Sequence, residues 1–161
     1  MHATLPLLER SDFPKIVRAK LKTLQVNLGY RCNQQCFHCH VNASPKRKEN
    51  MQAKTARQIA AYLYSAKLDS LDITGGAPEL NAHFRFLVGA AKSLGMHVMD
   101  RCNLTVLLEP GQEDLAAFLA ANKIEIIASL PCYSESNVDL QRGAGVFKKS
   151  IQALKILNKI G

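Results

Sequence analysis

Three cysteines lie close together in the segment Cys32-Asn-Gln-Gln-Cys36-Phe-His-Cys39. A cluster of this kind indicates metal ligation or redox chemistry, because thiols in a reducing compartment do not form a disulfide framework. Three thiolates can hold three irons of a [4Fe–4S] cluster, and the fourth iron is then left without a protein ligand. An open coordination position favours catalysis, by the reasoning that separates catalytic from structural zinc sites. The spacing therefore predicts a catalytic iron–sulfur site on these cysteines.

A zinc site is the alternative that the spacing leaves open. Zinc sites use cysteine pairs separated by two to four residues, so Cys32 and Cys36 fit either metal. His38 or His40 would then be the fourth ligand beside Cys39. In an iron–sulfur site, His40 is either a neighbour of the metal ligands or a loop side chain that faces solvent.

The elements around the cysteines alternate between strand and helix. Alternating apolar residues predict strands, and apolar residues three or four positions apart predict helices, with Asn50 and Asn81 as helix caps. The third strand has no clear end, because residues 104–108 are also apolar. The predicted strands are 24–28, 70–74, 97–99 and 124–130, and the predicted helices are 51–66, 82–94, 112–122 and 145–160.

Four strand–helix units in this order predict an α/β fold with a parallel sheet, a (βα)4 half of a partial TIM-type barrel. The cysteines directly follow the first strand, so they belong to the edge where the carboxyl ends of the strands meet. We expect an N-terminal extension over residues 1–23 and a core over residues 24–161. Because Gly161 ends a helix where a fifth strand would start, we expect a truncated barrel.

Glycines and polar residues follow the other predicted strands. Gly75 and Gly76 end the second strand, and adjacent glycines let a backbone approach a ligand closely. Asn103 follows the third strand and is a candidate for hydrogen bonding to a cofactor or substrate. Ser129 ends the fourth strand, where a hydroxyl points at the ligand of a barrel. We expect these residues to share one site with the cysteines.

The C-x3-C-x2-C segment after a first strand resembles the radical S-adenosylmethionine (SAM) superfamily, in which the open iron binds the amine and carboxylate of SAM. The segment Thr74-Gly75-Gly76-Ala77-Pro78-Glu79 is similar to the GGEP motif, which contacts the SAM amino group, although Ala77 replaces the usual Glu. Ser129 resembles a serine placed against SAM, and Arg142 resembles an arginine that pairs with the SAM carboxylate. The resemblance implies a [4Fe–4S] cluster and SAM as cofactors, and a reductant such as flavodoxin or ferredoxin.

Three further segments narrow this resemblance. HVMDRCNLTVL at 97–107, ASLPCY at 128–133 and QRGAGVFKKSI at 141–151 look like the arsenosugar-biosynthesis radical SAM (ArsS-like) family. The similarity runs from Leu24 to Gly161. It implies transfer of the adenosyl moiety of SAM to an arsenic compound by members that are longer than this chain.

Composition limits the partners and the compartment. The chain has 161 residues, of which 47% are hydrophobic, and a net charge of +8. We expect no nucleic-acid partner, because the basic residues are spread out and base-stacking aromatics are few. No apolar run approaches the roughly 20 residues that span a bilayer, so we expect a cytoplasmic protein. Cys102 and Cys132 stand apart from the cluster, and we expect Cys102 to be a small buried side chain.

These observations leave three interpretations of function. The first is a radical SAM enzyme that acts on a small molecule. The second is a fragment that binds the cluster and SAM without activity of its own, and the third is a zinc-stabilised interaction domain. A half barrel exposes two sheet edges, so we also expect the chain to pair with itself or with a missing C-terminal half.

Overall fold

The computed structural model describes residues 4–9, 11–12, 14 and 17–160. Its strands are β1 (Thr23–Asn27), β2 (Ser70–Thr74), β3 (His97–Asp100) and β4 (Glu125–Ile126). Its α-helices are α1 (Leu5–Leu8), α2 (Ala53–Ala66), α3 (Phe84–Ser93), α4 (Leu115–Ala121), α5 (Glu135–Arg142) and α6 (Val146–Ile160). Two 3-10 helices, η1 (Pro78–Leu80) and η2 (Leu104–Leu108), follow β2 and β3.

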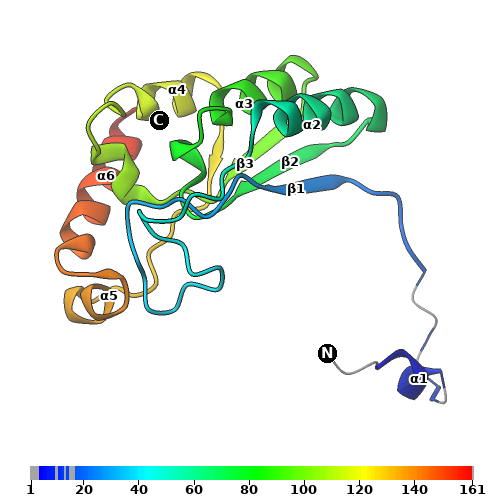
Figure 1. The fold of residues 1–161 in the computed structure, drawn as a ribbon, viewed down its shortest axis with the longest axis horizontal. Coiled ribbons are helices and arrows are strands. Elements are labelled where there is room, and N and C mark those ends of the chain that lie inside the picture. Colours follow the sequence, from blue (N-terminus) through cyan, green and yellow to red (C-terminus); the bar gives the residue numbers. More distant parts are fainter. Residues whose placement is uncertain (1–3, 10, 13, 15–16, 161) are drawn as a thin grey trace.

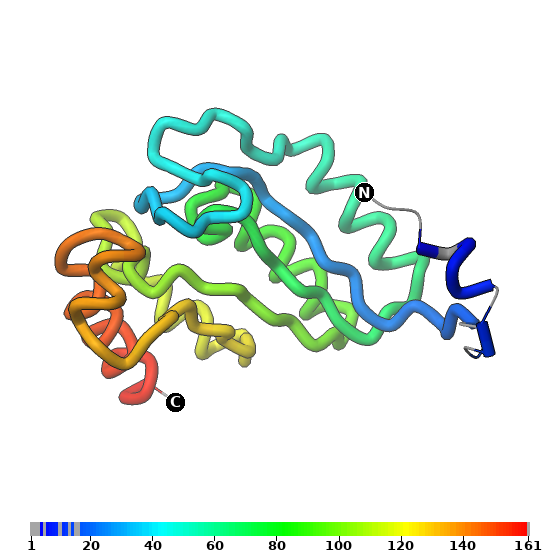
Figure 2. The backbone as a smooth tube through the Cα atoms, turned by 90° about the horizontal axis from the view of Figure 1, so that it is seen from below, coloured from blue at the N-terminus to red at the C-terminus, as the bar shows by residue number. Residues whose placement is uncertain are grey.

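The four strands form one parallel sheet in the order β1-β2-β3-β4 (Figure 1). Consecutive parallel strands need a crossover on one face of the sheet, and α2, α3 and α4 supply these crossovers. Figure 2, seen from below, shows the strands side by side and the cysteine-bearing loop beside the end of β1. The structure confirms the predicted α/β fold of four parallel strands, arranged as part of a barrel.

The helix-covered face of the sheet holds the core. Leu71 and Ile73 of β2 and Val98 of β3 point to this face and are fully buried. They pack with Phe84 and Leu87 of α3, whose apolar face repeats at helical spacing. Burial of these side chains fixes which face of each strand turns inward, because a shift of one residue would expose them.

The opposite face of the sheet carries polar side chains that pair across strands. Gln25 of β1 donates to Asp72 of β2 at 2.7 Å, and Arg101, just after β3, forms an ion pair with Asp72 at 2.9 Å. The hydroxyls of Thr23 and Ser70 lie 2.7 Å apart. In a closed barrel this face lines the interior, so the chain offers a polar interior surface.

Two elements differ from the sequence-based expectation. The fourth strand was expected to extend to Leu130, but β4 ends at Ile126. Beyond it the chain still bonds to the segment after β3, with the Ser129 N–H donating to the Cys102 carbonyl at 3.2 Å, but without a regular ladder. The helix α5 was not predicted, because it has few apolar residues and only Val138 is fully buried among them.

The predicted helix caps are also different. The residue before α2 is Gln52, not Asn50, so the prediction for Asn50 is wrong. The Asn50 side chain instead accepts a hydrogen bond from Asn81 Nδ2 at 2.8 Å. The Asn81 side chain accepts from the backbone N–H of His83 at 2.8 Å, ahead of α3, and His83 is the residue that precedes that helix.

The ends of the chain add little to this architecture. Figures 1 and 2 show α1 apart from the sheet and its helices. Gly161, expected to end the last helix, lies outside the described residues. Among the described residues, no helix is long and apolar enough to cross a membrane. The division into an extension and a core, and the compartment, stay predictions.

Candidate functional site

The cysteines lie on a loop that leaves β1 and returns beside it. The loop closes where the Met51 N–H donates to the Leu28 carbonyl at 2.9 Å. Inside the loop the Cys32 N–H donates to the Ser44 carbonyl at 3.2 Å, and the Cys39 N–H donates to the Cys36 carbonyl at 3.2 Å. These bonds hold an irregular loop in one conformation without a helix or strand.

A cavity of about 310 Å³ opens between this loop and the carboxyl ends of the strands. Six of the eight predicted site residues line it. They are Cys32, Cys36, Cys39, Gly76, Ser129 and Arg142. The parallel topology places these segments at the same edge of the sheet, although up to 110 residues separate them in the sequence.

Hydrogen-bond donors point at two of the three cysteine sulfur atoms. Cys32 Sγ accepts from the Gln34 N–H at 3.4 Å and from Asn103 Nδ2 at 3.4 Å. Cys39 Sγ accepts from the Ala43 N–H at 3.2 Å. Burial raises the pKa of the Cys32 thiol, and the Gln34 N–H opposes that rise. Donors aimed at sulfur are what a thiolate ligand needs, because it carries negative charge in a weakly solvated site.

The glycine turn after β2 packs against the cysteine loop. A Cβ on Gly76 would lie 2.6 Å from the Arg31 carbonyl oxygen, and a Cβ on Gly75 would lie 3.0 Å from that of Gly29. The Gly76 N–H donates to the Gly29 carbonyl at 2.9 Å. The glycines therefore serve the contact between two loops, and Gly75 does not line the cavity. Backbone carbonyl oxygens in such a turn can accept hydrogen bonds from an ammonium group.

Arg142 and Ser129 come from different elements and meet at the cavity. Arg142 is the last residue of α5 rather than part of a loop, and its side chain is buried. Its Nη1 donates to the Ser129 backbone carbonyl. Its Nε is buried and has no hydrogen-bond partner among the described residues. A buried guanidinium with an unused donor is suited to a carboxylate ligand.

Asn103 lies behind the cysteines rather than in the cavity. Its side chain is buried, and its Nδ2 donates to Cys32 Sγ and to Asn33 Oδ1, the latter at 2.6 Å. The expectation that Asn103 contacts SAM or substrate stays a prediction, and the structure gives the residue a different contact.

Sequence reasoning missed Gln34 and Thr105. Gln34 is buried, accepts from the Cys36 thiol at 3.5 Å and donates to the Thr105 hydroxyl at 2.8 Å. The only signal for Gln34 was its place inside the cysteine motif, and Thr105 gave none.

The remaining candidates divide between the cavity and its surroundings. His38 and His40 are both exposed and line the cavity. Cys102 is fully buried, as predicted. Cys132 lies in the loop after β4, and the hydroxyl of Ser134 is the main cause that lowers the pKa of its thiol to about 7.

Comparison with known proteins gives relatives with different named activities. The chain is 25% identical over 142 residues to the "Probable GTP 3',8-cyclase" of Saccharolobus islandicus, covering 88% of this chain and 45% of the relative. It is 27% identical over 135 residues to the mycofactocin maturase MftC of Mycolicibacterium smegmatis, covering 83% of this chain and 33% of that protein. The chain therefore spans less than half the length of these relatives.

Solved structures share the fold. The crystal structure of Streptococcus suis SuiB bound to S-adenosylmethionine matches 88% of this chain and 32% of SuiB, with a TM-score of 0.71 and 21% identity. The structure of anSMEcpe with bound AdoMet and a peptide matches 87% of this chain and 40% of anSMEcpe, with a TM-score of 0.70 and 20% identity. The family model described as "Radical SAM superfamily" matches residues 26–161. The chain belongs to the radical SAM superfamily, whose members bind a [4Fe–4S] cluster and SAM.

Proposed function

We propose that this chain forms the half-barrel core of a radical SAM enzyme, with Cys32, Cys36 and Cys39 as ligands of the [4Fe–4S] cluster. The observation that carries the proposal is the cavity that all three cysteines line together with Gly76, Ser129 and Arg142. Three protein ligands leave one iron open, and the unpartnered Nε of Arg142 gives a SAM carboxylate a donor. The residues therefore fit the cofactors of the superfamily.

The chain's own groups bind and orient SAM. The guanidinium of Arg142, fixed by its bond to the Ser129 carbonyl, holds the carboxylate. The carbonyl of Gly76 would accept from the ammonium group and the Ser129 hydroxyl would supply a further contact, since both residues line the cavity. When bound and reduced, the cluster supplies the electron that cleaves a carbon–sulfur bond of SAM. The reductant is a small electron carrier such as flavodoxin or ferredoxin.

Anaerobic reconstitution with iron and sulfide, followed by EPR of the reduced protein, tests the proposal. We expect a [4Fe–4S] signal that changes when SAM is added. Cys36→Ser removes one ligand and abolishes that cluster, whereas Cys132→Ser, a cysteine outside the cavity, leaves it intact. A signal that ignores SAM would support a cluster without the proposed SAM site. A Cys36→Ser variant that reconstitutes like wild type would contradict the ligand assignment.

We further propose a small-molecule substrate, and specifically an arsenic compound that receives the adenosyl moiety of SAM. The proposal is supported by the resemblance of residues 97–107, 128–133 and 141–151 to the ArsS-like family. SuiB and anSMEcpe, by contrast, are described with bound peptides. The test incubates reduced protein and SAM with a panel of inorganic and methylated arsenic compounds, and with peptides as the comparison. An adenosylated arsenic product seen by mass spectrometry would support the assignment, and turnover of SAM driven only by peptides would contradict it.

Zinc binding is the second candidate, because His38 and His40 line the same cavity as the three cysteines. One zinc and no iron per chain after reconstitution would favour a zinc-stabilised interaction domain.

A third outcome, slow reductive cleavage of SAM with no modified substrate, would identify a fragment that binds the cofactors without completing a reaction.

A further inference from the structure

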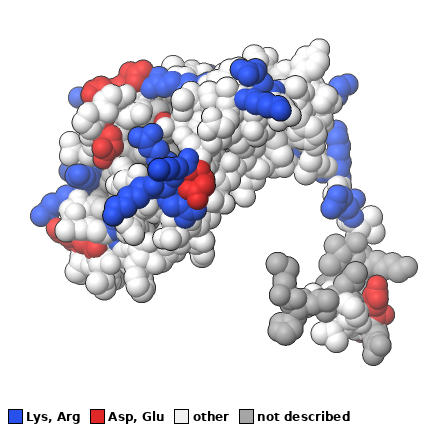
Figure 3. Space-filling view, in the orientation of Figure 1, with Lys and Arg blue, Asp and Glu red and all other residues white. Residues whose placement is uncertain are grey.

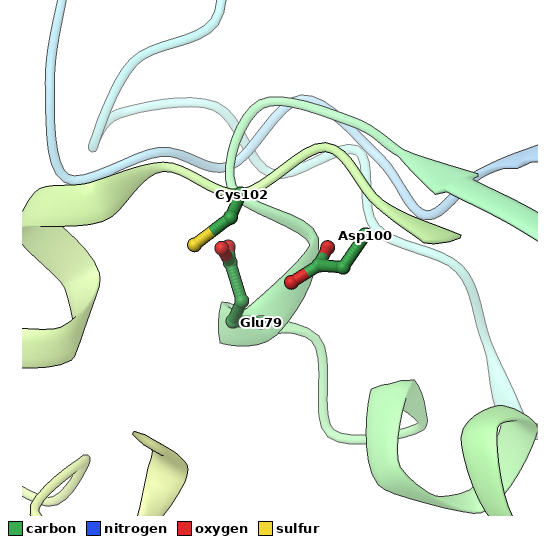
Figure 4. Close-up of side chains that lie close together, drawn as sticks. All are labelled: Glu79, Asp100 and Cys102. Atoms are coloured by element: carbon green, nitrogen blue, oxygen red, sulfur yellow. The ribbon is translucent and has the colours of Figure 1, made fainter. Parts of the chain in front are cut away.

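Three buried side chains meet behind the cysteine loop. Glu79 of η1, Asp100 at the end of β3 and Cys102 place one oxygen or sulfur atom each within 4.8 Å of the others. Figure 4 shows the two carboxyl groups and the thiol lying close together. Glu79 is 5% exposed, and the other two are fully buried. The group lies on the helix-covered side of the sheet, away from the cavity.

The two carboxyl groups have few hydrogen-bond partners. Glu79 Oε1 accepts from the Asn103 backbone N–H at 2.9 Å. Among the described residues, Glu79 Oε2 and both oxygens of Asp100 have no partner. Two ionised carboxylates in this position would be costly, because both are buried and the Asn103 N–H and the Cys102 thiol compensate the charge of Glu79 only in part. A bound proton supplies both a donor and charge balance.

The surrounding charges agree with a protonated pair. Burial raises the pKa of Glu79 to about 7, and burial, followed by the charge of Glu79, raises that of Asp100 well above its usual range. Asp72 adds to the rise at Asp100, and its own charge is already paired with Arg101. The charge of Arg142 acts on Cys102, whose thiol pKa burial raises well above its usual value.

Glu79 is joined to the cysteine site through Asn103. Glu79 Oε1 accepts a hydrogen bond from the backbone N–H of Asn103. The Asn103 side chain in turn donates to Cys32 Sγ at 3.4 Å. An N–H group directed at a ligand sulfur withdraws electron density from it, and such bonds are one of the factors that set the potential of an iron–sulfur cluster. In a cluster held by Cys32, the position of Asn103 would therefore affect the reduction potential.

We propose that Glu79 is a positioning residue for the iron–sulfur site: its neutral carboxyl group, paired with Asp100, fixes Asn103 so that its amide points at Cys32. The inference rests on the proposed function, since it requires a cluster on Cys32. The inference also assigns a role to Glu79, which follows Pro78. In the GGEP motif the Glu precedes the proline, at the position that Ala77 occupies here.

The test is the midpoint potential of the reconstituted cluster, measured by EPR-monitored titration without SAM. Glu79→Met keeps the side-chain length and removes the acceptor oxygen, whereas Glu79→Gln keeps Oε1. We expect Glu79→Met and Asn103→Ala each to shift the potential to more negative values, and the double variant to shift no further. Glu79→Gln retains the wild-type potential. Glu113→Ala, which removes an exposed carboxylate bonded to the Gly111 N–H, is the control that changes nothing.

Each contrary result has a distinct meaning. A wild-type chain that forms no cluster overturns the proposed function and this inference with it. A wild-type cluster whose potential ignores Glu79→Met, or additive shifts in the double variant, overturns the inference alone. A further measurement does not depend on the cluster. The triple variant with Cys32, Cys36 and Cys39 each changed to Ala is prepared with zinc, and its metal content is measured. We expect no bound zinc; one zinc that Glu79→Gln removes would mean that a cation balances the group, and would overturn the neutral pair.

Discussion

Gly76 shows how a single backbone position controls the site. A methyl group there would meet the Arg31 carbonyl oxygen at 2.6 Å and the Ala43 Cβ at 2.9 Å, and a backbone atom cannot move aside cheaply. We therefore predict that Gly76→Ala destabilises the fold by ~1–3 kcal/mol and impairs cluster reconstitution. Gly89 of α3 is the matched control, because the space that its Cβ would fill is open, and Gly89→Ala should stabilise the fold by about 0.5–1 kcal/mol. Urea denaturation measures both, and equal effects would contradict the steric argument.

The buried carboxyl group of Asp100 should make the stability of the fold decrease as the pH rises. The folded-state pKa of Asp100 is raised, so the folded chain binds a proton there more tightly than the unfolded chain. The stability that this protonation contributes is fully present below the ordinary carboxyl pKa near 4. As the pH rises from there toward the folded pKa, stability falls by up to about 1.4 kcal/mol per pH unit. We predict that Asp100→Asn is more stable than wild type at pH 8, and that the difference shrinks toward pH 4. Urea midpoints across this range measure it, and a difference independent of pH would contradict the protonated state.

At the residue scale the sequence predicts the residues that line the cavity better than it predicts the side chains packed behind them. The cysteine spacing located Cys32, Cys36 and Cys39 in the sequence, and the structure brings them to one cavity with Ser129 and Arg142. It could not reveal that Asn103 donates to Cys32, because that contact depends on the irregular segment that follows β3. Glu79 likewise depends on the η1 turn, which no periodic pattern marks.

At the scale of elements, α5 connects the cavity to the last helix. The Phe37 N–H in the cysteine loop donates to the Gln141 carbonyl of α5 at 2.9 Å, and the same helix carries Arg142. Asp139 of α5 accepts from the N–H groups of Gly145 and Phe147, at 2.7 and 2.9 Å, at the start of α6. One short polar helix therefore fixes both the cysteine loop and α6.

We predict that Asp139→Ala lowers the urea midpoint, because it leaves N–H groups at the start of α6 without an acceptor. The Phe147 N–H is the main cause that lowers the pKa of Asp139. The stability that the Asp139 carboxylate contributes is therefore present above the ordinary carboxyl pKa near 4. It is lost as the pH falls through the lowered pKa of the folded state. Asp139→Asn should retain part of the effect. Gln152→Ala on the exposed face of α6 is the control, and a drop in its midpoint equal to that of Asp139→Ala would contradict the capping role.

The strength of the periodic signal explains which elements were predicted. β2 and α3 have buried apolar faces with regular spacing, and both were found within two residues of their predicted bounds. α5 lacks a broad apolar face with regular spacing. Its backbone hydrogen bonds and the buried Arg142 side chain hold it in place instead. β4 was predicted too long, since Leu130 packs against the core from a segment that does not continue the strand after Ile126.

At the scale of the whole molecule, the excess positive charge is distributed. The net charge is +8, and Figure 3 shows Lys and Arg in several separate groups on one face, with Asp and Glu beside some of them. A nucleic-acid surface would instead need a continuous basic stripe, usually with aromatic side chains for stacking. The absence of a nucleic-acid partner stays a prediction, and the distribution on this face favours it.

The edge of the sheet at β4 gives the last prediction. Within the described residues β4 pairs only with β3, and an apolar hollow lined by Leu119, Ile124, Ile126 and Leu157 lies beside it, between α4 and α6. A strand with one unpaired edge next to partly exposed apolar side chains favours association. We predict that two copies of this chain pair through this edge, so that light scattering gives a mass that rises toward a dimer with concentration.

Leu157→Lys tests that prediction, because it places a charge in the hollow. We expect this variant to remain a monomer at concentrations where wild type is dimeric. Tyr64→Lys, at an exposed position of α2 that does not line the hollow, should leave the dimer unchanged. Because a stable interface buries more than about 1,000 Å², a second copy must cover the β4 edge and both flanking helices. A wild-type chain that stays monomeric at every concentration would contradict self-pairing through this edge.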